Sequence, residues 1–320
     1  MRVLAACASL KGVLSAQEAS AALAEGFRAV GIPADASPIA DGGEGTADVL
    51  AAALGGEWSE AQVSDPLERP VRARWLMLHD ETAVVESAEA IGLSRLAPDE
   101  LDPLRATSRG LGELIQEAAR YNPRALLVCL GGSATVDGGE GVREVLTSLP
   151  CKTTVLHDVR TTLRDAPRVY GPQKGATPEV IRELEGRLAA MAELRPYADV
   201  PGAGAAGGLG AALAALGAAL APGARAVLAR IGFEGRARTA ALVVTGEGTV
   251  DSTTLEGKAP GEAARVCREL GVPCAVFGGR VTDPVPGVRT LRLSGRPERA
   301  REDLLALGGQ LGRELVGGSS

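Results

Sequence analysis

The segment RVLAACASLKGVLSAQEASAALAEGFRAVG, residues 2–31, joins a short apolar run, a loop containing lysine and glycine, and an amphipathic helical pattern. Ser15 can cap the helix, because Glu18 follows at the position that completes a capping box. Residues 34–56 repeat the order with a short apolar run, an acidic glycine loop and an alanine-rich helix. Two consecutive units of strand, loop and helix predict parallel strands of an α/β sheet.

Apolar runs at 2–7, 34–39, 153–158, 241–246 and 274–279 each lead into a loop, which is typical of a flavodoxin-like parallel sheet. Between residues 59 and 150 the pattern changes to three strand-like segments with short turns, followed by a helix and another strand. Such short connections indicate antiparallel neighbours. We therefore predict a flavodoxin-like domain from residues 1–58 plus 151–320, and an inserted βββαβ domain at residues 59–150.

The composition is that of a globular protein, with 320 residues of which 45% are hydrophobic. The sequence contains neither an apolar stretch of about 18 residues nor a signal-peptide pattern, so we expect a cytoplasmic protein without membrane contact. A net charge of −6, no basic stripe and 2% aromatic residues argue against nucleic-acid binding. Five cysteines without a CxxC pair and only two histidines disfavour disulfides and a histidine-rich zinc site.

Acidic glycine-rich strings recur at residues 39–48 (IADGGEGTAD), 131–141 (GGSATVDGGEG) and 243–252 (VVTGEGTVDS). Glycine lets backbone N–H groups approach an anion, and a hard cation such as Mg²⁺ can lie between carboxylates and phosphate oxygens. The loops follow strand ends, so we expect them to converge on one cleft between two α/β domains. The alternative is that each acid only favours a turn or a helix start.

Three lysines lie beside glycines, at Lys11, Lys174 and Lys258, and are candidates for phosphate contacts. No Walker A string occurs, so a kinase of this sequence would not be of the P-loop class. The string GAGAAGGLG at residues 202–210 has the glycine spacing of a dinucleotide fingerprint but no obvious strand before it. Close helix packing is an equally good explanation for these glycines.

The strings SLKGVLSA, PIADGGEGT, DPLERPV, TAVVESAEAIGL, GGSATVDGGEG, GPQKGATPE, PGAGAAGGLGAAL and TGEGTVDSTTLEGKAP occur in this order between residue 9 and residue 260. In these motifs the chain resembles the type I glycerate kinases. The resemblance implies ATP-dependent phosphorylation of D-glycerate with Mg²⁺, generally to 2-phosphoglycerate. It also implies a flavodoxin-like domain with an inserted α/β domain of restriction-endonuclease-like type. Partners other than the two substrates are not implied, although a homodimer is compatible with it.

The matched motifs supply the candidate site residues. The catalytic candidates are Asp41, Asp137, Asp251 and Lys11. Glycerate contacts are expected from Ser9, Lys11, Arg69, Gly42, Gly43 and Ser133. Nucleotide contacts are expected from Gly131, Gly132, Thr135, Lys174, Glu247 and Lys258, and the Mg²⁺ ligands from Asp41, Glu44 and Asp158.

Four positions depart from the family motifs, namely Ala8, Val136, Thr161 and Thr253, where aspartate, asparagine, asparagine and glutamine are usual. We place Ala8 and Val136 after two strands at the same cleft. These departures motivate a second hypothesis, in which a catalytically impaired relative binds a nucleotide or a small hydroxy acid as a sensor. A hydride-transfer enzyme is a third hypothesis and rests only on residues 202–210.

Overall fold

The computed structural model describes residues 2–317, which form two compact units. The first unit consists of the chain up to Asp41 and from Ala224 onward, and the second consists of Gly42–Gly223. The α/β class with an inserted second unit is thus confirmed. The observed bounds differ from the expected ones, because the insertion begins earlier and ends later than residues 59–150.

The first unit contains a five-stranded sheet in which every strand pair is parallel. Its strands, in spatial order, are β11 (Arg289–Arg292), β10 (Cys274–Val281), β9 (Leu242–Val250), β1 (Val3–Cys7) and β2 (Ala34–Ala36). Counted along this unit alone, the order is 2-1-3-4-5, which is the order of a flavodoxin-like sheet. Strand β11 takes the place of the strand expected at residues 153–158. The order reverses between β1 and β9, where such sheets bind ligands at the carboxyl ends of the strands.

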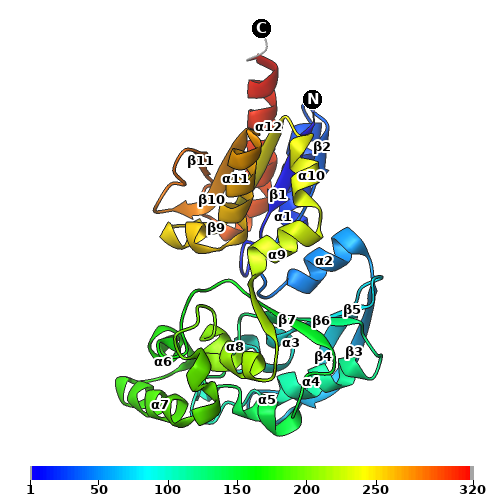
Figure 1. Cartoon of the computed structure of the whole chain (residues 1–320). Helices are drawn as coiled ribbons and strands as arrows, with labels where there is room; N and C mark the ends of the chain where they lie inside the picture. The colour runs from blue at the N-terminus through cyan, green and yellow to red at the C-terminus, as the bar shows by residue number, and fades with distance from the viewer. Residues whose placement is uncertain (1, 318–320) are drawn as a thin grey trace. The chain divides into compact units, whose positions relative to one another are not determined.

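The helices of the first unit are α1 (Ala16–Arg28), α9 (Gly223–Arg230), α10 (Phe233–Arg238), α11 (Ala259–Leu270) and α12 (Ala300–Gly317). The predicted capping box of α1 is present, because the Glu18 amide donates to Ser15 Oγ at 3.2 Å and the Ser15 amide donates to Glu18 Oε2 at 2.8 Å. Helices α1 and α12 pack closely (Figure 1), and a Cβ at Gly26 would lie 2.2 Å from the Leu305 carbonyl oxygen. Glycine therefore allows the two helix backbones to touch.

The second unit contains a six-stranded mixed sheet. Its strands, in spatial order, are β3 (Glu57–Ser64), β4 (Pro70–Met77), β5 (Thr82–Glu86), β6 (Ala125–Leu130), β7 (Lys152–His157) and β8 (Ala219–Pro222). Strands β3 to β5 are antiparallel as predicted, and β5 to β8 are parallel. Strand β7 was expected in the flavodoxin-like sheet, but it pairs with β6 from Ala125↔Lys152 to Leu130↔His157. This pairing explains why residues 151–223 belong to the inserted unit.

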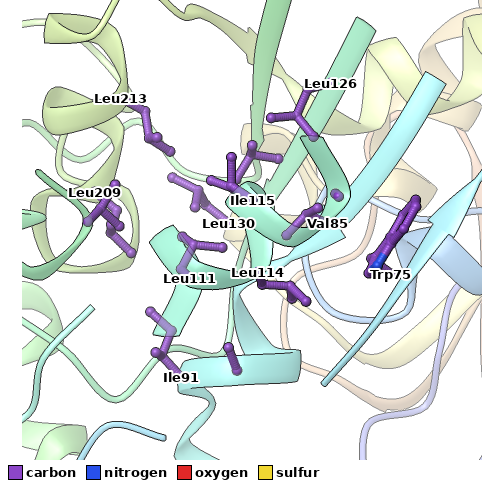
Figure 2. Close-up of a cluster of buried hydrophobic side chains, with 14 of the residues drawn as sticks. Trp75, Val85, Ile91, Leu111, Leu114, Ile115, Leu126, Leu130, Leu209 and Leu213 are labelled. Atoms are coloured by element: carbon purple, nitrogen blue, oxygen red, sulfur yellow. The ribbon is translucent and has the colours of Figure 1, made fainter. Parts of the chain in front are cut away.

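The helices of the second unit are α2 (Thr46–Leu54), α3 (Ser87–Ile91), α4 (Arg109–Ala119), α5 (Glu140–Val145), α6 (Ala166–Tyr170), α7 (Pro178–Ala190) and α8 (Ala205–Ala215). Figure 2 shows Leu111 and Leu114 of α4 in the core of this unit, with Leu209 of α8 on one side and Trp75 of β4 on the other. This core holds the helix starts and strand ends that carry the glycine loops. Across the described residues, no helix has the length and apolarity needed to cross a membrane.

Candidate functional site

In the first unit, the candidate site lies at the carboxyl ends of β1 and β9. Ser9 and Lys11 follow β1, with Ser9 half-buried and Lys11 exposed. A Cβ at Gly248 would lie 3.9 Å from the Lys11 amide nitrogen, so the glycine string of β9 lies directly beside the loop after β1. Ala8 is buried at the end of β1, and its amide donates to the Gly246 carbonyl at 3.0 Å. The loop after β1 and the glycine string of β9 therefore lie side by side within this unit.

An acidic cluster with one lysine accompanies these strand ends. Lys258 Nζ lies 3.6 Å from Glu247 Oε2 and 3.8 Å from Asp251 Oδ1. Burial raises the pKa of Glu247, and the negative charges of Asp41 and Asp251 raise it further, whereas Lys258 and a hydrogen bond from Thr254 lower it. Asp41 and Asp251 are thus close enough to Glu247 to act on it electrostatically. Such a group can share one cation or one proton.

The expected Mg²⁺ ligands Asp41, Glu44 and Asp158 are divided between the two units. Asp41 belongs to the first unit, whereas Glu44 and Asp158 belong to the second. Within residues 2–317, no three histidine, cysteine, aspartate or glutamate side chains are placed to hold a metal ion by themselves. Mg²⁺ usually needs only one or two carboxylates, because waters and substrate phosphates complete its shell. The carboxylates beside Lys258 fit that requirement.

In the second unit, two glycine loops pack backbone against backbone. A Cβ at Gly131 would lie 2.8 Å from Gly43 Cα, and one at Gly132 would lie 3.3 Å from Glu44 Oε2. Gly132 also has a φ of +64°, which L side chains rarely adopt. Ser87 supports the contact, because its Oγ accepts from the Gly131 amide at 3.2 Å and donates to the Gly131 carbonyl at 2.9 Å. The candidates Gly42, Gly43, Gly131, Gly132 and Ser133 therefore line adjoining loops.

Glu86 is a site residue that the sequence analysis missed. Its carboxylate accepts from the Gly45 amide at 3.1 Å and from the Ala47 amide at 2.6 Å, so it holds the acidic glycine loop at the start of α2. Glu86 is 4% exposed, and burial raises its pKa to about 7, with the charges of Asp48 and Glu89 adding to the shift. A glutamate that ends the otherwise apolar run TAVVE was the available signal.

Glu86→Gln is expected to remove a pH dependence of stability. The pKa of Glu86 is about 7 in the folded protein against an ordinary value of 4.5, so the folded state binds more protons between these pH values. This contribution to the free energy of unfolding is fully present below the ordinary pKa and is lost as the pH rises through about 7. One pKa unit corresponds to about 1.4 kcal/mol. As the pH rises from 4.5 through about 7, the free energy of unfolding of the wild type should therefore fall by about 3 kcal/mol more than that of the variant.

Urea denaturation at about pH 5 and about pH 8 measures this difference. The control is Glu60→Gln, which changes an exposed glutamate paired with Arg72 on β4 and should leave the wild-type pH dependence unchanged. Identical pH profiles for wild type and Glu86→Gln would contradict the assigned titration.

Asp137, one of the catalytic candidates, organises a loop. Its Oδ2 accepts from the Ser108 amide at 2.8 Å, from Ser108 Oγ at 2.7 Å and from the Gly141 amide at 3.2 Å, while Oδ1 accepts from the Gly139 amide at 3.0 Å. These bonds join the loop after β6 to the starts of α4 and α5. Both carboxylate oxygens are therefore already engaged by donors within the fold.

Lys174 and Arg69 are also engaged within the second unit. Lys174 Nζ donates to the Thr135 carbonyl at 2.7 Å and to Ser133 Oγ at 3.2 Å, and the residue is 2% exposed. Burial lowers the pKa of Lys174 to about 7, against an opposing influence of the Asp137 charge. Arg69, expected to hold the glycerate carboxylate, instead donates to Asp65 Oδ2 at 2.6 Å and to Glu100 Oε1 at 2.5 Å.

The glycine string at residues 202–210 serves close packing. A Cβ at Gly207 would lie 2.1 Å from the Thr135 carbonyl oxygen, and one at Gly208 would lie 2.9 Å from Gly138 Cα. Residues 206–208 have positive φ angles and interrupt the start of α8. A dinucleotide fingerprint requires a strand directly before the glycines. Here the preceding element is instead a 3₁₀ helix, residues 192–197. The packing explanation therefore accounts for these glycines.

Val136→Asn is expected to destabilise the protein without restoring a functional amide. Val136 was expected at a cleft, but it is 1% exposed in an apolar cluster with Leu163, Leu184 and Leu188. Burying an amide without partners costs about 1–3 kcal/mol in proteins. Urea denaturation should show this loss, and Val136→Ala gives the matched cost of the missing methyl groups alone. An asparagine variant as stable as wild type would contradict the burial of this side chain.

Comparisons with known proteins agree on one family. The model of the glycerate kinase family matches residues 3–149 and 147–295. The glycerate 2-kinase of Escherichia coli is 37% identical over 330 aligned positions, covering 89% of this chain and 87% of that protein. The glycerate kinase of Bacillus subtilis is 37% identical over 327 positions, covering 88% of this chain and 86% of that protein.

Solved structures give the same result for the fold. A crystal structure from Salmonella typhimurium, provisionally named glycerate kinase 2, superposes with a TM-score of 0.85. It shares 32% sequence identity, and the match covers 100% of this chain and 99% of that one. Coverage of this extent includes both sheets and every motif quoted above. The family resemblance seen in the sequence is confirmed, and the chain belongs to the glycerate kinase family.

Proposed function

We propose that the protein transfers the γ-phosphoryl group of ATP to D-glycerate and produces 2-phosphoglycerate. The observation that supports this most is the group of Asp41, Glu247, Asp251 and Lys258 at the carboxyl ends of β1 and β9. Phosphoryl transfer depends mainly on positioning and on charges around the moving group. Lys258 precedes α11, whose N-terminus adds a positive dipole end for a phosphate.

In this proposal, residues of the first unit bind Mg²⁺, accept the proton of the attacking hydroxyl and donate to substrate oxygens. Asp41 and Asp251 would hold Mg²⁺, which when bound neutralises negative charge on the phosphate oxygens. Asp41, in the acidic glycine string that the family motif shares, is also the group we assign to accept the proton of the attacking hydroxyl. Lys11, exposed in the loop after β1, and the neighbouring Ser9 would donate to substrate oxygens.

The adjoining loops of the second unit supply neutral donors. The Gly132 N–H group, with the hydroxyl of Ser133, would orient carboxylate or phosphate oxygens. The Gly42 and Gly131 amides donate within the fold, to Thr46 Oγ1 and Ser87 Oγ, and with Gly43 they would shape the substrate loop by their close backbone packing. Glu44 lies beside Gly132 and, like Asp158, is an acidic candidate for Mg²⁺ in this unit. Arg69 would have to leave Asp65 and Glu100 to reach a substrate, so we assign it a supporting role for its own loop.

A coupled assay of ADP release with D-glycerate, ATP and Mg²⁺ tests the proposal, with L-glycerate as the control substrate. Phosphorus NMR of the product identifies the phosphorylated hydroxyl, because the phosphorus of a 2-phosphate couples to one carbon-bound proton and that of a 3-phosphate to two. We expect glycerate-dependent ADP and the 2-phosphate. ADP release that is independent of D-glycerate would overturn the assignment.

The alternative is a catalytically impaired sensor, and the departures at four motif positions favour it. Thr161 and Thr253 are both used within the fold, because Thr161 Oγ1 accepts from the Tyr170 hydroxyl at 2.8 Å and the Thr253 amide donates to Asp251 Oδ1 at 2.9 Å. A sensor would gain thermal stability with ATP or D-glycerate, following RT ln(1 + [L]/Kd), without turnover. We further expect a cytoplasmic protein, with a homodimer as the assembly to test by light scattering.

A further inference from the structure

The ammonium group of Lys174 lies under the loop that follows β6. The residue closes the 3₁₀ turn Pro172–Lys174 and is followed by Gly175 with a φ of +91°. Its Nζ donates to Ser133 Oγ and to the Thr135 carbonyl, and it lies 5.7 Å from the centre of the Tyr170 ring. These contacts hold Lys174 inside the second unit, and two donors of its Nζ are used within the fold.

The direction of the hydrogen bond fixes what Ser133 can do. Lys174 Nζ is the donor in this hydrogen bond and Ser133 Oγ the acceptor, so Ser133 keeps its own proton for another oxygen. Ser133 is 3% exposed, and its hydroxyl donates to no acceptor in the part of the chain that the structure describes. The Thr135 hydroxyl is likewise buried without a hydrogen-bond partner among those residues. Buried hydroxyls left without partners are costly, so they point to an oxygen-rich ligand.

The opposite side of the same loop is held by Asp137, through its bonds to Ser108, Gly139 and Gly141. Gly207 packs against the Thr135 carbonyl from α8, where a Cβ would lie 2.1 Å away. The Thr135 carbonyl is therefore fixed by Lys174 on one side and by backbone on another. Among the described residues, the Ser133 hydroxyl proton and the Thr135 hydroxyl are therefore left for a ligand.

We propose that Lys174 is a positioning residue that orients Ser133 and Thr135 to donate to an anionic oxygen of a substrate, without touching that substrate itself. The proposal rests on the proposed function and replaces the direct phosphate contact expected from the motif. The anionic oxygen belongs either to a phosphate of ATP or to the carboxylate of D-glycerate. The substrate whose KM responds distinguishes the two sources.

The test is a double-mutant cycle of Lys174→Met and Ser133→Ala, with KM measured separately for ATP and D-glycerate. Loss of a hydrogen bond to a charged group corresponds to roughly a tenfold change in kcat/KM. Each single variant should show about this loss, and the double variant should lose little more, because both remove the same oriented hydroxyl. Lys258→Met with Ser133→Ala is the matched control, and their effects should multiply because Lys258 contacts Glu247 and Asp251.

Multiplying losses for Lys174→Met and Ser133→Ala would show an independent phosphate contact and overturn the proposal. If kcat/KM changes equally for ATP and D-glycerate, in proportion to the fraction of folded protein, the role of Lys174 is purely structural. That result would also overturn the proposal. Replacing a buried charge by an apolar side chain of similar length is often neutral or stabilising, so Lys174→Met should fold.

Hydrogen exchange of the amides at 131–137 provides a readout that needs no turnover. In Lys174→Met these amides should exchange faster than in wild type, whereas Lys258→Met should leave them unchanged. Unchanged exchange in Lys174→Met would overturn the positioning role even if D-glycerate proved not to be the substrate. Absence of D-glycerate turnover by wild type would instead overturn only the proposed function.

Discussion

Replacing Asp41 by asparagine is expected to lower kcat by about 100-fold or more while leaving the fold intact, which is the usual size of effect for a positioned acid or base. The change removes one negative charge and keeps the shape of the side chain. The charge of Asp41 contributes to the raised pKa of Glu247, so the variant should also lower the pKa of Glu247. The coupled assay measures kcat, and a thermal melt of the same sample verifies folding.

The control for Asp41→Asn is Asp35→Asn, which changes an exposed aspartate of β2 that pairs with Arg2 at 3.0 Å. An exposed ion pair of this kind contributes little, so kcat should stay within about twofold of wild type. Near-normal turnover of Asp41→Asn would show that the loop after β2 serves only to start α2. In that case Asp251 would be the next candidate for the proton acceptor.

Asp137→Ala is expected to lower the free energy of unfolding by about 3 kcal/mol or more, because a hydrogen bond to a charged group contributes about 1.5–3 kcal/mol. The variant leaves the amides of Ser108, Gly139 and Gly141 without their acceptor. Activity should fall as well, since the loop that carries Ser133 loses its anchor. Urea denaturation measures the stability, and activity per folded molecule is obtained from the same preparation.

The control for Asp137→Ala is Asp99→Ala, a substitution of an exposed aspartate in the same unit, which should change stability by less than about 0.5 kcal/mol. Asp137→Asn should lie between the two, because an amide keeps one acceptor oxygen and turns a donor toward the remaining N–H groups. A large loss of kcat in Asp137→Asn with wild-type stability would restore Asp137 as a general base.

The sequence by itself determined the features that depend on neighbouring residues. The apolar runs and the helical pattern with Ser15 and Glu18 predicted the α/β class, and short turns predicted the antiparallel order of β3 to β5. The motifs identified the family, and their glycines allow close backbone contact, as at Gly131, where a Cβ would lie 2.8 Å from Gly43 Cα. Local sequence patterns are enough to predict structure where the spacing of apolar residues, helix capping and the residues of turns determine it.

Only the tertiary structure decided which strand joins which sheet and what each polar group does. Parallel strands buried on both faces have the same apolar composition, so the run at β7 could not show that it pairs with β6. Asp137 meets Ser108 from 29 positions away, and Lys174 meets Ser133 from 41. Val136 follows a strand like a site residue, yet α7 and α8 cover it. The role of a carboxylate or an ammonium group depends on the partners that folding brings within hydrogen-bond distance, and sequence spacing carries no record of those partners.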